Sequence, residues 1–280
     1  MNKMLRVAVG SGGGGGEPVW CDASTASYDS VSFDVGSQEG APYGVAFKPD
    51  GTKMYVVGSS SDSVYQYTLS TAWDLDTASY DSVSFDVSSQ EGSAKDVAFK
   101  PDGTKMYMVG SRSDSVHQYT LSTAWDLNTA SYDSVSFSVD AQESSPSGLE
   151  FKPDGTKMYV VGSSSGSVHQ YTLLTAWGLD TVSYDSVSFD VSSQESFPFG
   201  VAFKPDGTKM YMVGNGSTGT LYQYTLSTAW DLDTASYDSV ALDVSSQESS
   251  PRGVTFKPDG TKMYLIGFSS DSVHQYSLVC

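Results

Sequence analysis

Basic residues are scarce in this chain. Its 280 residues include 15 Lys and Arg against 33 Asp and Glu, which gives a formal net charge of −18. Such a charge opposes the phosphate backbone of nucleic acids and the surface of anionic membranes. No apolar run approaches the roughly 18 residues that a membrane-spanning helix needs. We therefore expect neither a nucleic-acid partner nor membrane insertion.

Histidine and cysteine are scarcer still, with 3 and 2 copies. The chain shows no Cys/His spacing typical of a metal site, no Gly-rich phosphate-binding loop, and no Ser, His and Asp in the order of a known catalytic triad. The aspartates of the connectors, such as Asp74 and Asp76, lack the glycine of a calcium-binding loop and are explained as turn caps. We predict no metal, no cofactor and no catalytic residue.

Repetition is what the chain has in abundance. The string FKPDGTKMY begins at five phenylalanines that are spaced by 52 or 53 residues: Phe47, Phe99, Phe151, Phe203 and Phe256. A fixed period of this length is typical of stacked or radial repeat folds, in which each unit buries its faces against its neighbours. The five copies must therefore form one structure.

Each unit contains four short strand-like segments, labelled A to D in chain order. In the first unit, residues 44–47 and 53–58 flank a Pro-Asp-Gly turn, in which proline presets φ and glycine supplies a positive φ. Residues 63–69 and 79–87 follow, and the last segment alternates apolar with polar residues. Four such strands in about 50 residues match one propeller blade. The sequence thus predicts an all-β, five-bladed β-propeller with four antiparallel strands per blade.

The hairpin FKPDGTKMYVVG resembles the inner hairpin of YVTN-type and TolB-type propeller repeats, and the resemblance covers residues 28–280. The near-identical copies also resemble the uniform propeller repeats of environmental bacteria and phages. This resemblance implies the fold strongly and the function weakly, because propellers support many unrelated activities. The related lactonase-type enzymes have seven blades, whereas this chain has five units.

The order of the segments predicts how the ring closes. The first D segment, residues 27–35, precedes every A, B and C segment, and the last unit ends after its C segment. We expect this N-terminal strand to complete the blade formed by residues 252–279, because closure removes an open sheet edge. The propeller then comprises residues 20–280.

Residues 1–19 are expected to form an N-terminal tail with a Gly-rich hinge. Leu5, Val7 and Val9 alternate along it, and residues 11–16 are a flexible tether. A short tethered strand can add to the sheet edge of another protein, so we predict other virion or surface proteins as its partners. A leader without a role is the alternative. The tail carries no recognisable secretion signal.

The two cysteines flank the same connector of the closed ring. Alignment of the units places Cys21 in the slot of Asp74 and Cys280 in the slot of Thr71. This offset within one turn is compatible with the Cα separation of a disulfide, below about 7 Å. We predict a Cys21–Cys280 disulfide, which indicates an oxidising location outside the cytoplasm. Two unpaired thiols are the alternative.

The two faces of the predicted ring differ among the copies. The A–B turns are identical and the C–D connectors nearly so, whereas chemically large substitutions occur in the D–A and B–C loops of the opposite face. Aromatic and arginine residues are the types that anchor binding surfaces. We predict a ligand-binding face from these variable residues: Tyr43, Lys95, Arg112, Phe197, Phe199, Arg252 and Phe268. Drift in exposed loops would produce the same variation.

Two acidic residues stand out in the inner strands of adjacent blades. Asp96 and Glu150 replace Gly44 and Ala46 of the first unit, and they would approach each other at the central channel. Two carboxyl groups can perform acid–base chemistry or hold a cation. We interpret them as solvated channel residues.

These observations favour a protein that is not an enzyme. The main hypothesis is a surface or virion structural module, such as a fibre, decoration or adhesin subunit, located extracellularly or on a virion surface. Its variable face would bind a glycan or another host-surface ligand. The alternative is a propeller hydrolase, such as a lactonase or a glycan-cleaving enzyme, with Asp96 and Glu150 as its acidic centre.

Overall fold

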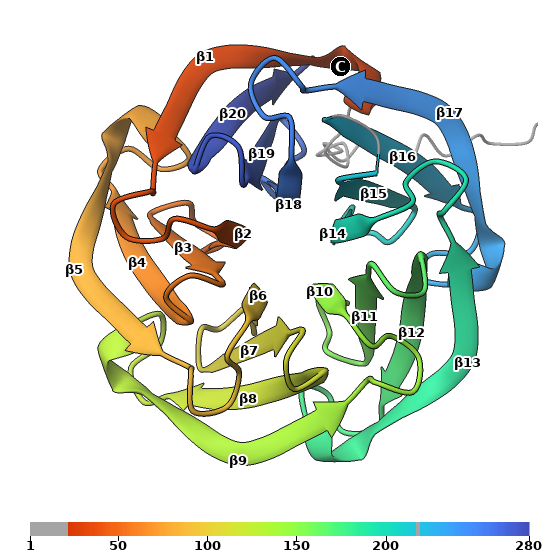
Figure 1. The fold of residues 1–280 in the computed structure, drawn as a ribbon, viewed down its shortest axis with the longest axis horizontal. Helices are drawn as coiled ribbons and strands as arrows, with labels where there is room; N and C mark the ends of the chain where they lie inside the picture. The colour runs from red at the N-terminus through yellow and green to blue at the C-terminus, as the bar shows by residue number, and fades with distance from the viewer. Residues whose placement is uncertain (1–21, 217–218, 280) are drawn as a thin grey trace, which may run out of the picture.

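The protein, described from a computed structural model, forms a ring of five four-stranded antiparallel sheets around a central axis (Figure 1). The structure describes residues 22–216 and 219–279. The ring confirms the predicted five-bladed β-propeller. The predicted tail of residues 1–19 and the predicted disulfide between Cys21 and Cys280 lie outside the described residues.

Each blade runs from an innermost strand at the channel to an outer strand at the perimeter. The innermost strands, at position A, are β2 (Pro42–Phe47), β6 (Ala94–Phe99), β10 (Pro146–Phe151), β14 (Pro198–Phe203) and β18 (Pro251–Phe256). The strands at position B are β3 (Lys53–Gly58), β7 (Lys105–Gly110), β11 (Lys157–Gly162), β15 (Lys209–Gly214) and β19 (Lys262–Gly267). Those at position C are β4 (Ser63–Leu69), β8 (Ser115–Leu121), β12 (Ser167–Leu173), β16 (Thr220–Leu226) and β20 (Ser272–Leu278). The outer strands are β1 (Ala26–Asp34), β5 (Ala78–Asp86), β9 (Ala130–Ser138), β13 (Val182–Asp190) and β17 (Ala235–Asp243).

The ring closes by exchange of the first strand. Strand β1 pairs antiparallel with β20, from Ala26 opposite Leu278 to Asp34 opposite Ser272, so the closing blade has the order β1-β20-β19-β18. In Figure 1 the red β1 lies against the blue β20. This confirms the predicted role of the N-terminal strand.

The connections divide between two faces. The turn face carries the A–B turns and the C–D connectors, which in the first blade are residues 48–52 and 70–77. Each C–D connector contains a short 3₁₀ turn, and one more precedes β1: η1 (Ala23–Thr25), η2 (Leu75–Thr77), η3 (Leu127–Thr129), η4 (Leu179–Thr181) and η5 (Leu232–Thr234). The loop face carries the D–A and B–C loops, which begin at residues 35 and 59 in the first blade.

Aromatic side chains join adjacent blades at the turn face. Trp125 packs on Phe99 of its own second blade, with ring centroids 5.3 Å apart. It also packs on Tyr55 of the first blade, with ring centroids 6.1 Å apart. The Tyr55 hydroxyl donates a 2.7 Å hydrogen bond to the Trp125 carbonyl. Gly103 adopts a positive φ of 74° against the indole, where a Cβ would clash. The identical turns are therefore required by blade packing.

A polar network also links the blades. A bulge at Ser82 (φ 58°) interrupts the outer strand β5. The neighbouring Asp81 carboxylate accepts hydrogen bonds from Lys53 Nζ at 2.9 Å and Gln66 Nε2 at 2.8 Å. The Gln66 side-chain oxygen then accepts the Leu127 amide of the next blade at 3.1 Å. The repeated Lys, Gln and Asp are thus structural.

The loop face has its own repeated framework. In the first blade, Glu39 is fully buried and its carboxylate accepts hydrogen bonds from the backbone amides of Ala41, Ser60 and Ser61 at 2.9 to 3.2 Å. One buried glutamate per blade has this place: Glu39, Glu91, Glu143, Glu195 and Glu248. These carboxylates hold each B–C loop against the preceding D–A loop, which leaves the exposed loop positions free to vary.

Candidate functional site

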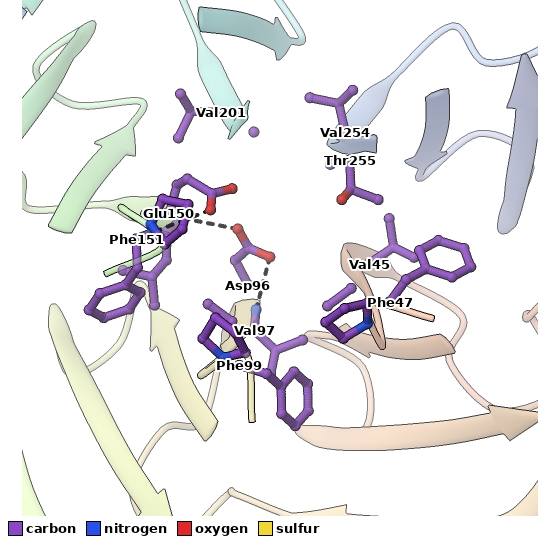
Figure 2. Close-up of a pocket in the computed structure, with 18 of the residues that line it drawn as sticks. Val45, Phe47, Asp96, Val97, Phe99, Glu150, Phe151, Val201, Val254 and Thr255 are labelled. Atoms are coloured by element: carbon purple, nitrogen blue, oxygen red, sulfur yellow. Dashed lines mark hydrogen bonds between the residues drawn. The ribbon is translucent and has the colours of Figure 1, made fainter. Parts of the chain in front are cut away.

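The central channel contains a cavity of about 260 Å³. Its walls come from the innermost strands, and prolines of the A–B turns line its mouth: Pro49, Pro101, Pro153 and Pro258. The cavity therefore opens on the turn face. Figure 2 shows its lining, with Asp96 and Glu150 directed into the space between the blades.

Two levels of the channel wall carry the polar groups. At the third residue of strand A, four blades have glycine (Gly44, Gly148, Gly200 and Gly253) and the second blade has Asp96. At the fifth residue, three blades have alanine, the third has Glu150, and the closing blade has Thr255. Each polar residue thus replaces a small residue of the repeat. The acidic pair arises from departures from the repeat.

Backbone amides of two blades hold the Asp96 carboxylate. Oδ1 accepts a hydrogen bond from the Val97 amide at 2.8 Å, and Oδ2 accepts one from the Leu149 amide of the third blade at 2.9 Å. A Cβ on Gly44 of the first blade would lie 2.4 Å from Asp96 Oδ1, so the glycine leaves space for this group. Burial raises the pKa of Asp96 to about 7, although both amide hydrogen bonds oppose that shift.

Glu150 lies one level nearer the mouth. Its Oε1 accepts the Phe151 amide at 3.2 Å. Burial and the nearby negative charge of Asp96 raise the pKa of Glu150 to about 8. Because Asp96 has two amide donors and Glu150 has one, Asp96 loses its proton first. Near neutral pH the pair therefore holds one carboxylate and one carboxylic acid. Two carboxyl groups in these states can act as a general base and a general acid.

The opposite end of the channel carries four of the predicted ligand-binding residues. Lys95 Nζ lies 3.7 Å from the centre of the Tyr43 ring, and the Arg252 guanidinium carbon lies 4.0 Å from that of Phe199. The Tyr43 and Phe199 rings meet edge to face at 5.9 Å. These residues come from four blades, so their contacts span this end of the channel. We name Tyr43, Lys95, Phe199 and Arg252 the end cluster.

The other predicted ligand-binding residues lie farther out on the loop face. Phe268 is 49% exposed, and its ring centre is 5.7 Å from the Arg252 guanidinium, so it borders the end cluster. Phe197 is 53% exposed and Arg112 is also exposed. Neither makes a ring or cation–π contact with the end cluster in the described part of the chain. The ligand-binding role of all seven residues stays a prediction.

Comparison with known proteins identifies the family. The sequence model for "Lactonase, 7-bladed beta-propeller" matches residues 35–218, which is more than half of the chain. The chain belongs to this lactonase family. It has five blades where the family is described by seven. No curated protein matches the lactonase-family chain.

The lactonase-family chain is similar to solved structures, and one of them, with a TM-score above 0.5, supports the same fold. The periplasmic gluconolactonase PpgL of Pseudomonas aeruginosa is 17% identical with a TM-score of 0.52, over 84% of this chain and 66% of that one. A functionally unknown protein from Desulfotomaculum acetoxidans is 14% identical with a TM-score of 0.48, over 81% and 62%. The chain thus spans less than two thirds of either protein, and at these identities the likeness concerns the fold.

The family match corrects the functional prediction. A non-enzymatic surface or virion module is the wrong main hypothesis, because the match places the chain in the lactonase family and favours the alternative of a propeller hydrolase. The loops hold most of the large differences among the five copies, whereas Asp96 and Glu150 each occur in one copy only, so the repeat gives the acidic pair a weak sequence signal.

Thr255 is a channel residue that the sequence reasoning missed. It lines the cavity of the lactonase-family chain on the wall opposite the acidic pair (Figure 2). Its signal was present in the alignment of the copies, since it replaces the alanine found at Ala46, Ala98 and Ala202. Its hydroxyl is the third polar side chain in the wall at these two levels.

Three buried Glu-Ser-His sets in the lactonase-family chain resemble a triad in composition. In the second blade, the Ser113 hydroxyl donates to Glu91 at 2.6 Å and lies 2.9 Å from His117 Nε2. The serine hydrogen is committed to the carboxylate, and the histidine is 6% exposed. This set secures a B–C loop.

Among the described residues no group of three or more acidic, His or Cys side chains is arranged to hold a metal, and no helix is long and apolar enough to span a membrane.

Proposed function

We propose that the chain is a lactone hydrolase that works in the channel cavity. The observation that carries this proposal is the pair of half-buried carboxyl groups in the cavity wall, Asp96 and Glu150, whose raised pKa values of about 7 and about 8 bracket a state in which one of the two is protonated. The family match supports the reaction type. Ring opening of a lactone requires a base to activate water and an acid to protonate the departing ring oxygen, and this pair supplies both.

The proton positions assign the roles. Asp96, ionised first, takes a proton from a water molecule in the cavity. The water oxygen forms a bond to the lactone carbonyl carbon, and the carbonyl electron pair moves onto its oxygen. When this intermediate collapses, the bond between the carbonyl carbon and the ring oxygen breaks, and Glu150 donates its proton to that oxygen. Transfer of a proton from Asp96 to Glu150 restores the starting state, and the product is a hydroxy acid.

The negative oxygen of the intermediate needs hydrogen-bond donors. The Thr255 hydroxyl lies on the wall opposite the acidic pair. The hydrogen bonds of the Val97, Leu149 and Phe151 amides show that the inner edge of strand A presents donors to the channel. The repeat puts the amides of Val201 and Val254 at the strand position that Val97 and Leu149 have in theirs. We assign oxyanion stabilisation to Thr255 and these two amides.

The cavity favours a small, uncharged lactone. It has two carboxyl groups and no Lys or Arg among its lining residues. A phosphorylated or carboxylated substrate would be repelled by Asp96 without any compensating cation. A volume of about 260 Å³ lies just below the range of about 300 to 1,000 Å³ typical of small-molecule pockets, which suits a single ring. The product carboxylate is repelled by the same charge, which assists its release.

The test measures ring opening of a neutral sugar lactone and of its phosphorylated form with a pH indicator. We expect turnover of the neutral lactone with kcat/KM highest between pH 7 and 8, where Asp96 is ionised and Glu150 is protonated. Asp96→Asn and Glu150→Gln should each lower kcat by about 100-fold or more. Asp96→Gly and Glu150→Ala introduce the residues that other blades have at these positions. They remove the same two carboxyl groups, and the blade is known to accept the new residues.

The matched control is Asp76→Asn on an exposed 3₁₀ turn, since the second blade carries Asn128 in that slot. It should leave turnover unchanged. Equal loss in the control, or full turnover in both channel variants, would reject the proposed roles. Faster turnover of the phosphorylated lactone would reject the proposed neutral substrate but would still support lactone hydrolysis.

Two finer predictions remain proposals beside the reaction. The repeats are proposed to be of the YVTN or TolB type, on the hairpin FKPDGTKMY. An extracytoplasmic location is proposed on the predicted Cys21–Cys280 disulfide. Intact-mass measurement without reductant should find these two cysteines linked, and two alkylatable thiols in fresh protein would contradict both the bond and the location drawn from it.

A further inference from the structure

The pairing of basic side chains singles out the loop face. Lys3 and Arg6 lie outside the described residues, which leaves 13 of the 15 Lys and Arg residues. Ten of these 13 form an ion pair with an aspartate, and all ten pairs lie at the turn-face end of the blades. Among the described residues, the three without an ion pair are Lys95, Arg112 and Arg252. All three lie on the loop face.

Two of these cations belong to the end cluster and share one aromatic ring. Lys95 Nζ lies 3.7 Å from the centre of the Tyr43 ring, and the Arg252 guanidinium carbon lies 5.0 Å from it. The guanidinium also lies over Phe199 at 4.0 Å. Aromatic rings therefore lie beside the guanidinium, and its terminal N–H groups are the donors that we assign to a ligand.

Burial makes these charges costly to leave alone. Lys95 is 9% exposed, and Arg252 Nε is buried without a hydrogen-bond partner among the described residues. Glu248 is the carboxylate that acts on Arg252, but its oxygens already accept the amides of Ser250, Ser269 and Ser270. Two neighbouring cations without a counter-ion, in a chain of net charge −18, indicate that an anion completes the site.

We propose that the end cluster is a binding site for a small organic carboxylate, separate from the hydrolytic cavity. A planar carboxylate matches the paired terminal nitrogens of Arg252, Nη1 and Nη2, and would lie near the Lys95 charge. The half-exposed Phe268 ring beside Arg252 offers apolar contact to the body of the ligand, which an inorganic anion would not use. The end-cluster residues do not line the cavity that holds Asp96 and Glu150, so this proposal does not depend on lactone hydrolysis.

The probe is benzoate, measured by titration calorimetry on the full chain at low salt. We expect saturable binding of one benzoate per chain with a Kd in the millimolar range or below, weakening as salt is added. Benzamide has the same ring without the charge and should bind at least about tenfold more weakly, because the buried cations require an anion. Inorganic phosphate tests whether the ligand needs an apolar body as well as a negative charge. It should bind more weakly than benzoate.

Serine variants locate the site. Arg252→Ser and Lys95→Ser introduce the residue that Ser147 already provides in the same slot of the third blade. Each should weaken benzoate binding by about tenfold or more, and benzoate should shift the NMR signals of the Tyr43 and Phe199 rings in the parent. Lys48→Ser on the turn face is the control and should bind like the parent.

Several outcomes would overturn the proposal. These are benzoate heat that does not saturate, benzamide binding equal to that of benzoate, or Arg252→Ser binding equal to that of the parent. Phosphate binding tighter than benzoate would also overturn it, since the aromatic contacts would then have no part. Lactone turnover is measured separately, so loss of one activity does not imply loss of the other.

Discussion

The turn face and the loop face of this ring are built from the same repeat but use it differently. At the turn face every blade has the same Lys-Pro-Asp-Gly turn and the same Lys–Asp pairs, and among the described residues the same tryptophan packing recurs at Trp73, Trp125, Trp177 and Trp230. At the loop face the buried glutamates repeat, while the residues above them differ from blade to blade and include the three cations that have no ion pair within the described part of the chain. The contrast shows that packing between blades constrains one face throughout and the other only in its buried layer.

Replacement of a turn-face tryptophan should give the largest effect on stability. Trp125 is 8% exposed and joins two blades through Phe99 and Tyr55. Trp125→Ala should lower the free energy of unfolding by about 3 to 5 kcal/mol, as measured by chemical denaturation. Leu174→Ser is the control on the same face, because Leu174 is 85% exposed and other blades have serine there, for example Ser70. Equal stability of the two variants would mean that packing does not explain the uniform face.

Removal of the channel carboxyl groups should give an intermediate effect that depends on pH. Burial raises the pKa of Asp96 and of Glu150, so between about pH 4 and 8 the folded protein holds more protons than the unfolded chain. The stability contributed by these groups is therefore full at low pH and is lost as pH rises through their folded pKa values. Each pKa unit corresponds to about 1.4 kcal/mol.

The double variant Asp96→Asn with Glu150→Gln removes this dependence. As pH rises from 5 to 9, the free energy of unfolding of the variant should increase by about 2 to 4 kcal/mol relative to that of the parent. Water in the channel screens part of the effect of the two pKa shifts. Chemical denaturation of both proteins at several pH values measures this difference. The contributions of the carboxylates that both proteins contain cancel when the two free energies are subtracted. A difference that stays constant with pH would show that the two groups titrate normally.

Serine replacement at the end cluster should change stability least. Each cation–π contact contributes about 0.5 to 1 kcal/mol, and removal of one of two neighbouring cations relieves repulsion that offsets the loss. Lys95→Ser and Arg252→Ser should therefore each alter the free energy of unfolding by less than about 1 kcal/mol in thermal or chemical denaturation. A loss comparable to that of Trp125→Ala would make the end cluster part of the framework and erase the contrast between the faces.

The repeat made most of the fold predictable. The spacing of the FKPDGTKMY copies predicted the number of blades, and the orphan D segment at residues 27–35 predicted its pairing with the last C strand. The candidate site was predictable only in part. The sequence predicts Asp96 and Glu150 as neighbours at the channel and, under the alternative hypothesis, as an acidic centre, whereas it does not single out Thr255.

The sequence by itself determined the blade, its turns, the count of five and the closure of the ring, because these depend on local turn chemistry and on a period that the chain states five times. The tertiary structure decided what lies between blades. It placed the Leu149 amide of one blade on the Asp96 carboxylate of another, and it brought Tyr43 and Phe199 together at the end of the channel. Such contacts depend on how closely the inner strands approach the axis, and the raised pKa values follow from the burial that this approach creates.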